Sequence, residues 1–258
     1  LEQKKLKKNI AWHLYQKKIL NNCDYIHATS EDEKKHLEEL GIKTPIKIIP
    51  HGVIIKSTKK IKKKEKQKKE ALFFSRIHEK KGILELLNSW SIIKPTNWIL
   101  KIYGPVSDMS YMNEIKKKIL QLSLEDSVFI FDPVFEYDQK EDIFLKSDCF
   151  LLPSKSENFA LTVAESLAVE VPVIATKKTP WSGLETHRCG WWVEEREDAI
   201  ADALKVALGT PHKQLIDMGY RGKKWMEKDF SWELSCLKTV EAYKWVTNLV
   251  KKPSFIYK

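Results

Sequence analysis

The sequence has few cysteines and no pair of them spaced to hold a metal. Its four cysteines are scattered without a C-x-x-C pair, and none of its seven histidines completes a zinc site with them. We therefore expect reduced thiols with a structural, buried role, as in a cytosolic protein. The cysteines are Cys23, Cys149, Cys189 and Cys236.

Several other signatures are missing. No run approaches the roughly 18 apolar residues needed to cross a bilayer, and no charged-then-apolar start resembles a secretion signal, so we expect a soluble protein. Neither G-x-x-x-x-G-K-[ST] nor G-x-G-x-x-G occurs, which leaves ATPase and nicotinamide-dependent functions without support, and there is no D-x-D metal motif. The sequence starts at Leu1 rather than at a methionine, which suggests a start within a longer protein.

The positive charge is concentrated at one end of the chain. The formal net charge is +10, and residues 1–70 hold 19 lysines against 9 acidic residues, whereas the remaining 26 basic and 26 acidic residues cancel. Because the rest of the chain has no basic bias, we expect no nucleic-acid partner. The basic N-terminal region is expected either to contact an anionic membrane peripherally or to stay solvated.

From Ala71 onward, short apolar runs alternate with stretches of helical periodicity. This alternation predicts an α/β fold in which right-handed crossovers join parallel strands into a doubly wound, Rossmann-like sheet. Ligands of such sheets bind beyond the carboxyl ends of the strands. The apolar runs are ALFFS, WILKIYG, SVFIFD, CFLLPS and VPVIAT, each followed by a longer helical stretch.

The chain divides by composition into four segments. Residues 1–55 carry a helix, the strand YIHAT, the helix SEDEKKHLEELG and the strand IKIIP, too little sheet for a separate domain. The lysine-rich residues 56–70 predict an exposed linker, and residues 71–231 contain the predicted sheet. Residues 232–258 contain a final helix, predicted to pack back on earlier structure through side chains at helical spacing: Leu237, Val240, Tyr243 and Val246.

Two acids flank the start of an apolar helix expected from about residue 160. At about 100° per residue, Glu165 falls in the same arc as Leu161 and Ala164, so its carboxylate points toward the buried side. It therefore needs hydrogen-bond donors, which either a sugar diol or an ordinary salt bridge would supply. Glu157 lies in the loop before the helix, where free N–H groups attract phosphate. It is expected either to reach past the phosphate to sugar hydroxyls or to be a solvated loop acid.

Two cations follow the first strand of the predicted sheet. In FFSRIHEKKG, Arg76 comes directly after the strand and Lys81 precedes a glycine and a new helix. Arginine offers a bidentate contact to phosphate and lysine a point charge, so the two could hold a diphosphate without a metal. The alternative is that both are simply solvated.

Three segments in order, RIHEKKG, SENFALTVAESLAVEVPVIAT and TPWSGLETHRCGWWVE, resemble the nucleotide-sugar-binding half of glycosyltransferase family 4. Members of that family are retaining enzymes of the GT-B fold. The resemblance implies that residues 71–231 are the second domain of this fold, and that residues 1–55 are a remnant of the acceptor-side first domain. The final helix would pack back toward that first domain. The sequence departs from the family at Asp132, Asn158 and Glu170, which stand where glycine is common.

The resemblance also implies the site residues. Glu157 and Glu165 form the E-x7-E motif, with Glu157 contacting the donor sugar and Glu165 the ribose diol. Arg76 and Lys81 would bind the diphosphate and, with Glu157, make up the catalytic set. Backbone groups of the loop before the helix would meet phosphate or sugar, and the backbone of Val134 the nucleobase. No metal or cofactor is implied, and the full donor-binding set is Arg76, Lys81, Val134, Glu157, Asn158, Phe159, Ala160, Leu161 and Glu165.

The expected function is that of the donor-binding portion of a retaining glycosyltransferase. It would transfer a hexose from a nucleoside-diphosphate sugar to a surface glycan or glycolipid, as in polysaccharide or lipopolysaccharide biosynthesis, in the cytoplasm and at the inner face of the membrane. Acceptor binding needs the missing part of the first domain, so the isolated chain is expected to lack turnover. One alternative is a non-catalytic module that binds a nucleotide sugar or a partner protein; another is a GT-B-type epimerase, which the Glu157 pattern disfavours.

Overall fold

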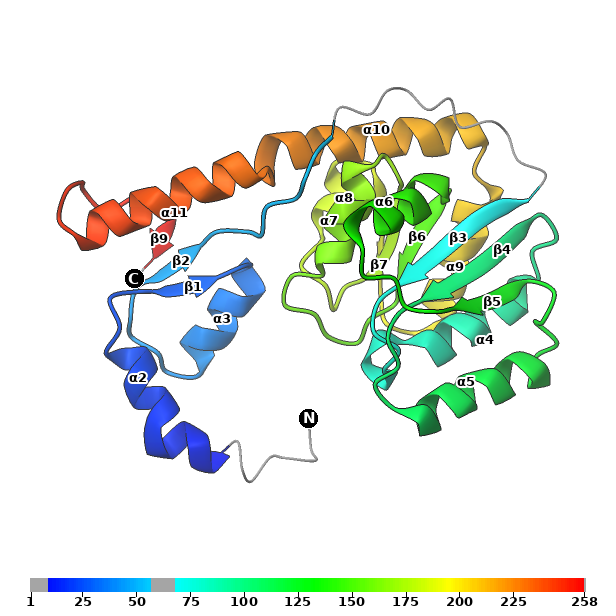
Figure 1. Cartoon of the computed structure of the whole chain (residues 1–258), viewed down its shortest axis with the longest axis horizontal. Helices are drawn as coiled ribbons and strands as arrows, with labels where there is room; N and C mark the ends of the chain where they lie inside the picture. Colours follow the sequence, from blue (N-terminus) through cyan, green and yellow to red (C-terminus); the bar gives the residue numbers. More distant parts are fainter. Residues whose placement is uncertain (1–8, 57–67, 258) are drawn as a thin grey trace. The chain divides into compact units, whose positions relative to one another are not determined.

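The computed structural model describes residues 9–56 and 68–257 (Figure 1). Residues 1–8 and 258 lie outside the described residues, and so do residues 57–67, most of the predicted linker. The chain divides by its contacts into two compact units. One comprises the residues up to Gly52 together with those from Trp232 onward, and the other is Val53–Ser231.

The larger unit is built on a six-stranded sheet in which every neighbouring pair is parallel. The strand order is β5-β4-β3-β6-β7-β8, which confirms the predicted doubly wound sheet and all five predicted strands. The additional strand, β8, is four residues long and lies at an edge of the sheet. The strands are β3 (Lys69–Phe74), β4 (Trp98–Tyr103), β5 (Val128–Phe131), β6 (Cys149–Leu152), β7 (Val173–Thr176) and β8 (Gly190–Val193).

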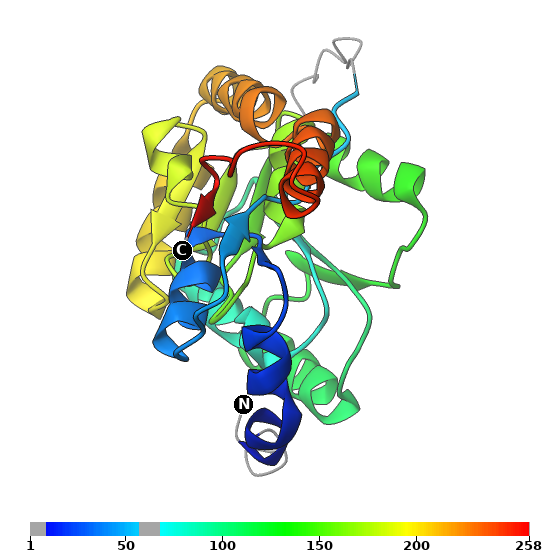
Figure 2. The same cartoon turned by 90° about the vertical axis from the view of Figure 1, so that its left-hand side faces the viewer.

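Helices cover both faces of this sheet (Figures 1 and 2). Successive strand residues point to opposite faces, so Phe73 packs in one buried cluster with α4, α5 and α9, while Leu72 and Phe74 pack in another with α6, α7, α8 and α10. Burial on both faces explains why β6 and β7 are continuous apolar runs, whereas β4, β5 and β8 are only partly buried. The helices are α4 (Ile83–Ile93), α5 (Met109–Gln121), α6 (Tyr137–Lys146), α7 (Leu161–Ala168), α8 (Gly183–Thr186), α9 (Glu197–Gly209) and α10 (His212–Asp229).

Strand β3 begins earlier than the lysine-rich composition predicts. Lys69 and Glu70, assigned to the linker from the sequence, are its first two residues. The reason is a pairing across the sheet: Lys101 on β4 donates to the Glu70 carboxylate at 2.7 Å, and Glu70 N donates to Asp148 Oδ2 at 2.9 Å. These contacts give polar residues partners inside the sheet, where they would otherwise be costly.

The smaller unit contains a three-stranded sheet of order β1-β2-β9. Strands β1 (Ile26–Ala28) and β2 (Ile46–Ile48) are parallel and flank α3 (Glu31–Glu39), as predicted, and β9 (Ile256–Tyr257) pairs antiparallel with β2. Ahead of them lie η2 and α2, and α11 precedes β9. Their bounds are η2 (Trp12–Gln16), α2 (Lys17–Asn21) and α11 (Trp232–Val246).

The predicted packing face of α11 is wrong. Leu237, Val240 and Tyr243 are 68%, 49% and 58% exposed, whereas the buried residues of the helix are Ser235 and Ala242. The Ser235 hydroxyl donates to the carbonyl of Pro50 at 2.9 Å. Small side chains therefore let the helix approach the rest of its unit closely, while three of the four predicted side chains point outward and the fourth, Val246, is partly buried. No helix among the described residues is long and apolar enough to span a bilayer.

The strand order defines where a ligand would bind to the larger unit. From β3 the chain proceeds to β4 and β5 on one side, and from β6 to β7 and β8 on the other. The carboxyl ends of β3 and β6 therefore meet at the point where the winding reverses. Doubly wound sheets bind their ligands in the crevice at such a switch point.

Candidate functional site

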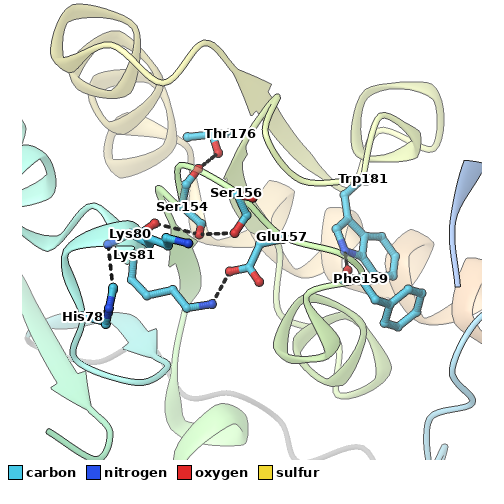
Figure 3. Close-up of polar contacts among 9 residues, drawn as sticks. All are labelled: His78, Lys80, Lys81, Ser154, Ser156, Glu157, Phe159, Thr176 and Trp181. Carbon is cyan, nitrogen blue, oxygen red and sulfur yellow. Dashed lines mark hydrogen bonds and ion pairs between the residues drawn. The ribbon is translucent and has the colours of Figure 1, made fainter. Parts of the chain in front are cut away.

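Two loops meet at the carboxyl ends of β3 and β6. The first carries Arg76 and Lys81, with the 3-10 turn η3 (Glu79–Lys81), and the second is residues 153–160. Lys155 N donates to the carbonyl of Lys80 at 2.8 Å. The buried Ser154 hydroxyl donates to the same carbonyl at 3.0 Å (Figure 3). A backbone hydrogen bond therefore joins the loop that carries Arg76 and Lys81 to the loop that carries Glu157.

Gly82 allows these loops to approach. It has a φ of 70°, a left-handed conformation that costs other residues about 1–2 kcal/mol, and a Cβ there would lie 2.0 Å from the Pro153 carbonyl oxygen. Changing Gly82 to alanine is therefore expected to lower the free energy of unfolding by at least about 2 kcal/mol, measured by urea denaturation. Gly209→Ala is the control, because nothing lies within 4 Å of its Cβ position. An equal effect of both substitutions would contradict the role of the close approach.

The structure brings Lys81 and Glu157 together. The Lys81 ammonium donates to Oε1 of Glu157, and the two side chains are only 13% and 12% exposed (Figure 3). Glu157 is thus not the solvated loop acid that was one expectation from the sequence. Arg76, at the end of β3, is exposed and forms no hydrogen bond or ion pair with any described residue.

Buried polar groups behind the loop hold it in place. The Thr176 hydroxyl at the end of β7 donates to the Ser154 carbonyl, and the Trp181 indole N–H donates to Phe159 O at 2.5 Å (Figure 3). Glu157 N donates to Lys178 O at 3.0 Å. Thr176 and Trp181 are each 1% exposed. Sequence reasoning missed these supports, although a hydroxyl residue closing each of the apolar runs CFLLPS and VPVIAT was a usable signal.

The remaining residues of the loop differ in what they present. Phe159 is buried, with its ring centroid 5.3 Å from that of Trp181, so its side chain belongs to the core and only its backbone can face a ligand. Asn158 and Leu161 are exposed. Ala160 caps α7 with a φ of 61°. Val134, expected at the nucleobase, is partly buried in the connection between β5 and α6.

Of the three positions where the family commonly has glycine, only one has the left-handed backbone conformation that glycine adopts easily. Glu170 has a φ of 64° at the end of α7, whereas Asp132 and Asn158 do not have positive φ values. The Lys223 ammonium donates to Glu170 at 3.3 Å. The departures at Asp132 and Asn158 are therefore compatible with ordinary backbone geometry.

Glu165 is 20% exposed and lies beside the buried Ala164, as its spacing predicts, although Leu161 of the same predicted arc is 40% exposed. Its partner is Lys140 of α6, whose Nζ lies 2.6 Å from each carboxylate oxygen. The contact with Oε1 has hydrogen-bond geometry, but Oε2 is buried and accepts no such bond from the described residues. Burial raises the pKa of the Glu165 carboxyl, and Lys140 offsets part of that rise.

The arrangement gathers cations and hydrogen-bond acceptors at one edge of a doubly wound sheet. Lys81 offers positive charge in the loop before α7, Arg76 follows the end of β3, and the two glutamates offer acceptors for hydroxyl donors. Among the described residues there is no group of three or more His, Cys, Asp or Glu side chains placed to hold a metal ion. The fold is that of a doubly wound α/β domain of the kind found in GT-B transferases.

A family model described as glycosyl transferases group 1 matches residues 55–225. The chain therefore belongs to the group 1 glycosyl transferases, and the resemblance found in the sequence is confirmed at this level. Membership of glycosyltransferase family 4 in particular stays a prediction.

Curated relatives agree with this family. The chain is 25% identical over 185 residues to the lipopolysaccharide core biosynthesis mannosyltransferase LpsB of Rhizobium meliloti, covering 67% of this chain and 50% of LpsB. It is 26% identical over 208 residues to alpha-monoglucosyldiacylglycerol synthase of Streptococcus pneumoniae, covering 75% of this chain and 46% of the synthase. The chain thus spans about half the length of the curated relatives it matches.

Solved structures agree with the fold. HepE of Anabaena, crystallised with UDP and glucose, superimposes with a TM-score of 0.76 at 16% identity, covering 88% of this chain and 65% of HepE. At this identity the likeness establishes the shared fold.

Proposed function

We propose that this chain is the donor-binding portion of a retaining glycosyltransferase that transfers a hexose from a nucleoside-diphosphate sugar to a surface glycan or glycolipid. The observation that carries the proposal is the buried ion pair of Lys81 and Glu157 in the loops at the switch point of the sheet, where Arg76 also follows β3. Such a site offers charge to a diphosphate and acceptors to a sugar at the same place.

Each residue has a distinct role in this proposal. Arg76 and Lys81 stabilise the diphosphate, whose negative charge increases as the bond to the sugar breaks, and the N-terminus of α7 adds its dipole. Glu157 accepts from sugar hydroxyls and Glu165 from the ribose diol. Lys81 then contacts both Glu157 and the diphosphate, so the existing ion pair orients the cation before the donor binds.

The two cations also support a reaction that needs no bound metal. Arginine and lysine can neutralise a leaving diphosphate without a divalent ion. We propose that the chain uses no cofactor and that the donor is its principal small-molecule partner.

The acceptor class is proposed from the relatives. One acts in lipopolysaccharide core biosynthesis and another is named for a glucosylated diacylglycerol, so a glycan or lipid acceptor fits the family's chemistry. We also propose peripheral contact of the lysine-rich N-terminal region with anionic lipid at the cytoplasmic face of the membrane. Part of that region, residues 1–8 and 57–67, lies outside the described residues.

Titration calorimetry of UDP, GDP and their hexose conjugates tests the donor site. We expect one nucleotide to bind, and Glu165→Ala to weaken its binding by about 1.5–3 kcal/mol, the range for hydrogen bonds to a charged group. The matched control is Glu125→Ala. Glu125 is an exposed acid in the turn before β5, at the amino ends of the strands and so away from the site. Absence of binding to every nucleotide, or equal losses in both variants, would contradict the proposed donor site.

A further inference from the structure

Lys140 belongs to no motif, yet it is the partner of Glu165. We propose that Lys140 is a positioning residue for the nucleoside: it fixes the Glu165 carboxylate so that this group accepts from the vicinal hydroxyls of a ribose, and it thereby makes the site selective for ribonucleotides. The inference rests on the proposed function, since it assumes that a nucleoside diphosphate binds at this edge of the sheet.

The geometry of the pair leaves acceptor capacity on the carboxylate. A carboxylate offers about four lone-pair sites, and Lys140 Nζ uses one of them in its hydrogen bond to Oε1 at 2.6 Å. Oε2 is buried and accepts no hydrogen bond from the described residues, although the ammonium lies 2.6 Å away from it. In this proposal the hydroxyls of the bound ribose donate to lone pairs of the carboxylate that Lys140 leaves unused.

Lys140 also opposes the rise in the pKa of the Glu165 carboxyl that burial causes. Burial favours the protonated form of Glu165, and the Lys140 ammonium is the group that opposes this effect. In a protonated carboxyl, one oxygen carries a hydrogen and acts as a donor, so the group has fewer sites that can accept hydrogen bonds. A neutral side chain at position 140 would therefore weaken recognition of a diol even with Glu165 intact.

The lysine is held on more than one side. Its Nζ lies 5.4 Å from the centroid of the Phe74 ring at the end of β3, within range of a cation–π contact. Phe74 is buried and stacks on Tyr103 at 5.9 Å. Because the ammonium lies near both a packed ring and a carboxylate, the pair is attached to the sheet and not only to two surface helices. The Lys140 side chain is 22% exposed.

The simpler alternative is a salt bridge that only stabilises the fold. The two accounts differ in their dependence on the ribose hydroxyls. A structural salt bridge would affect the binding of all nucleotides equally, whereas a positioning residue matters only when the diol is present.

The experiment titrates Lys140→Met and Lys140→Arg with whichever of UDP and GDP binds, and with its 2′,3′-dideoxy counterpart. We expect Lys140→Met to weaken binding of the ribonucleotide about tenfold and to change binding of the dideoxynucleotide less than about twofold. Lys140→Arg, which keeps the charge, should recover most of the affinity. In a Glu165→Ala background, Lys140→Met should have no further effect.

Lys117→Met, an exposed lysine on α5, is the matched control, and thermal unfolding checks that each variant is folded. Equal weakening for both ligands, or a full effect of Lys140→Met without Glu165, would overturn the inference while leaving the donor site intact. Failure of the unsubstituted chain to bind any nucleotide would overturn the proposed function and this inference with it.

Discussion

Replacing Lys81 with methionine is expected to lower both the free energy of unfolding and the affinity for a nucleoside diphosphate. Its partner Glu157 is 12% exposed, so the substitution leaves a largely buried carboxylate without its cation. We expect a loss of about 2–3 kcal/mol in unfolding free energy, somewhat below the value for a fully buried pair. Loss of a charge-assisted contact to phosphate should weaken binding by about 10- to 100-fold.

The double variant Lys81→Met/Glu157→Gln separates these two effects. Removing the unpaired carboxylate should restore most of the stability, because a neutral amide is less costly to bury. The affinity should stay low, since the cation that faces the diphosphate is still missing. Chemical denaturation and calorimetry on the same samples measure the two quantities.

A second ion pair in the same unit provides the control. Lys101 and Glu70 lie 2.7 Å apart and are comparably buried, but Glu70 is at the start of β3, the other end of the strand from the site. Lys101→Met should reduce stability without reducing affinity. If Lys81→Met lowers the free energy of unfolding but leaves the affinity for the nucleoside diphosphate unchanged, the ion pair is structural and Lys81 has no part in donor binding.

Much of the fold follows from the sequence because the sheet is buried on both faces. Such strands are mostly apolar, so the runs from ALFFS to VPVIAT identify β3 to β7, although β3 begins with Lys69 and Glu70 and β4 contains Lys101. Helical periodicity placed Glu165 on the buried side of α7 for a similar reason, because it reports which side of an element faces the core.

Periodicity does not reveal what packs against that side. Lys140 and Trp181 contact the site from elements 25 and 22 residues away in the chain, and neither belongs to a repeating pattern. The same limit explains the error on α11, where Leu237 and Val240 have helical spacing but the small residue Ala242 faces the core. Spacing identifies a stripe on a helix, whereas the shape of the neighbouring structure decides which stripe is buried.

Substitution of Trp181 should have the largest effect on stability. It is 1% exposed, contacts the rings of Phe159, Trp225 and Phe230, and donates to the Phe159 carbonyl. Trp181→Ala is expected to lower the free energy of unfolding by about 3–5 kcal/mol through the cavity it leaves. Trp181→Phe keeps most of the volume but leaves a buried carbonyl without its donor, at a cost of about 1–3 kcal/mol.

Trp181→Phe also tests how the loop serves the site. The lost hydrogen bond supports the backbone between Glu157 and α7, so we expect the affinity for a nucleoside diphosphate to fall along with the stability. Trp98→Phe is a matched control: Trp98 is equally buried and its indole donates to the Leu208 carbonyl at 3.0 Å, but it begins β4 at the opposite edge of the sheet. Both variants should lose similar stability, and only Trp181→Phe should lose affinity. If Trp181→Phe and Trp98→Phe bound the nucleoside diphosphate equally well, the loop would keep its shape without the indole. The contacts of Ser154 and Lys155 with Lys80 would then be what orders it.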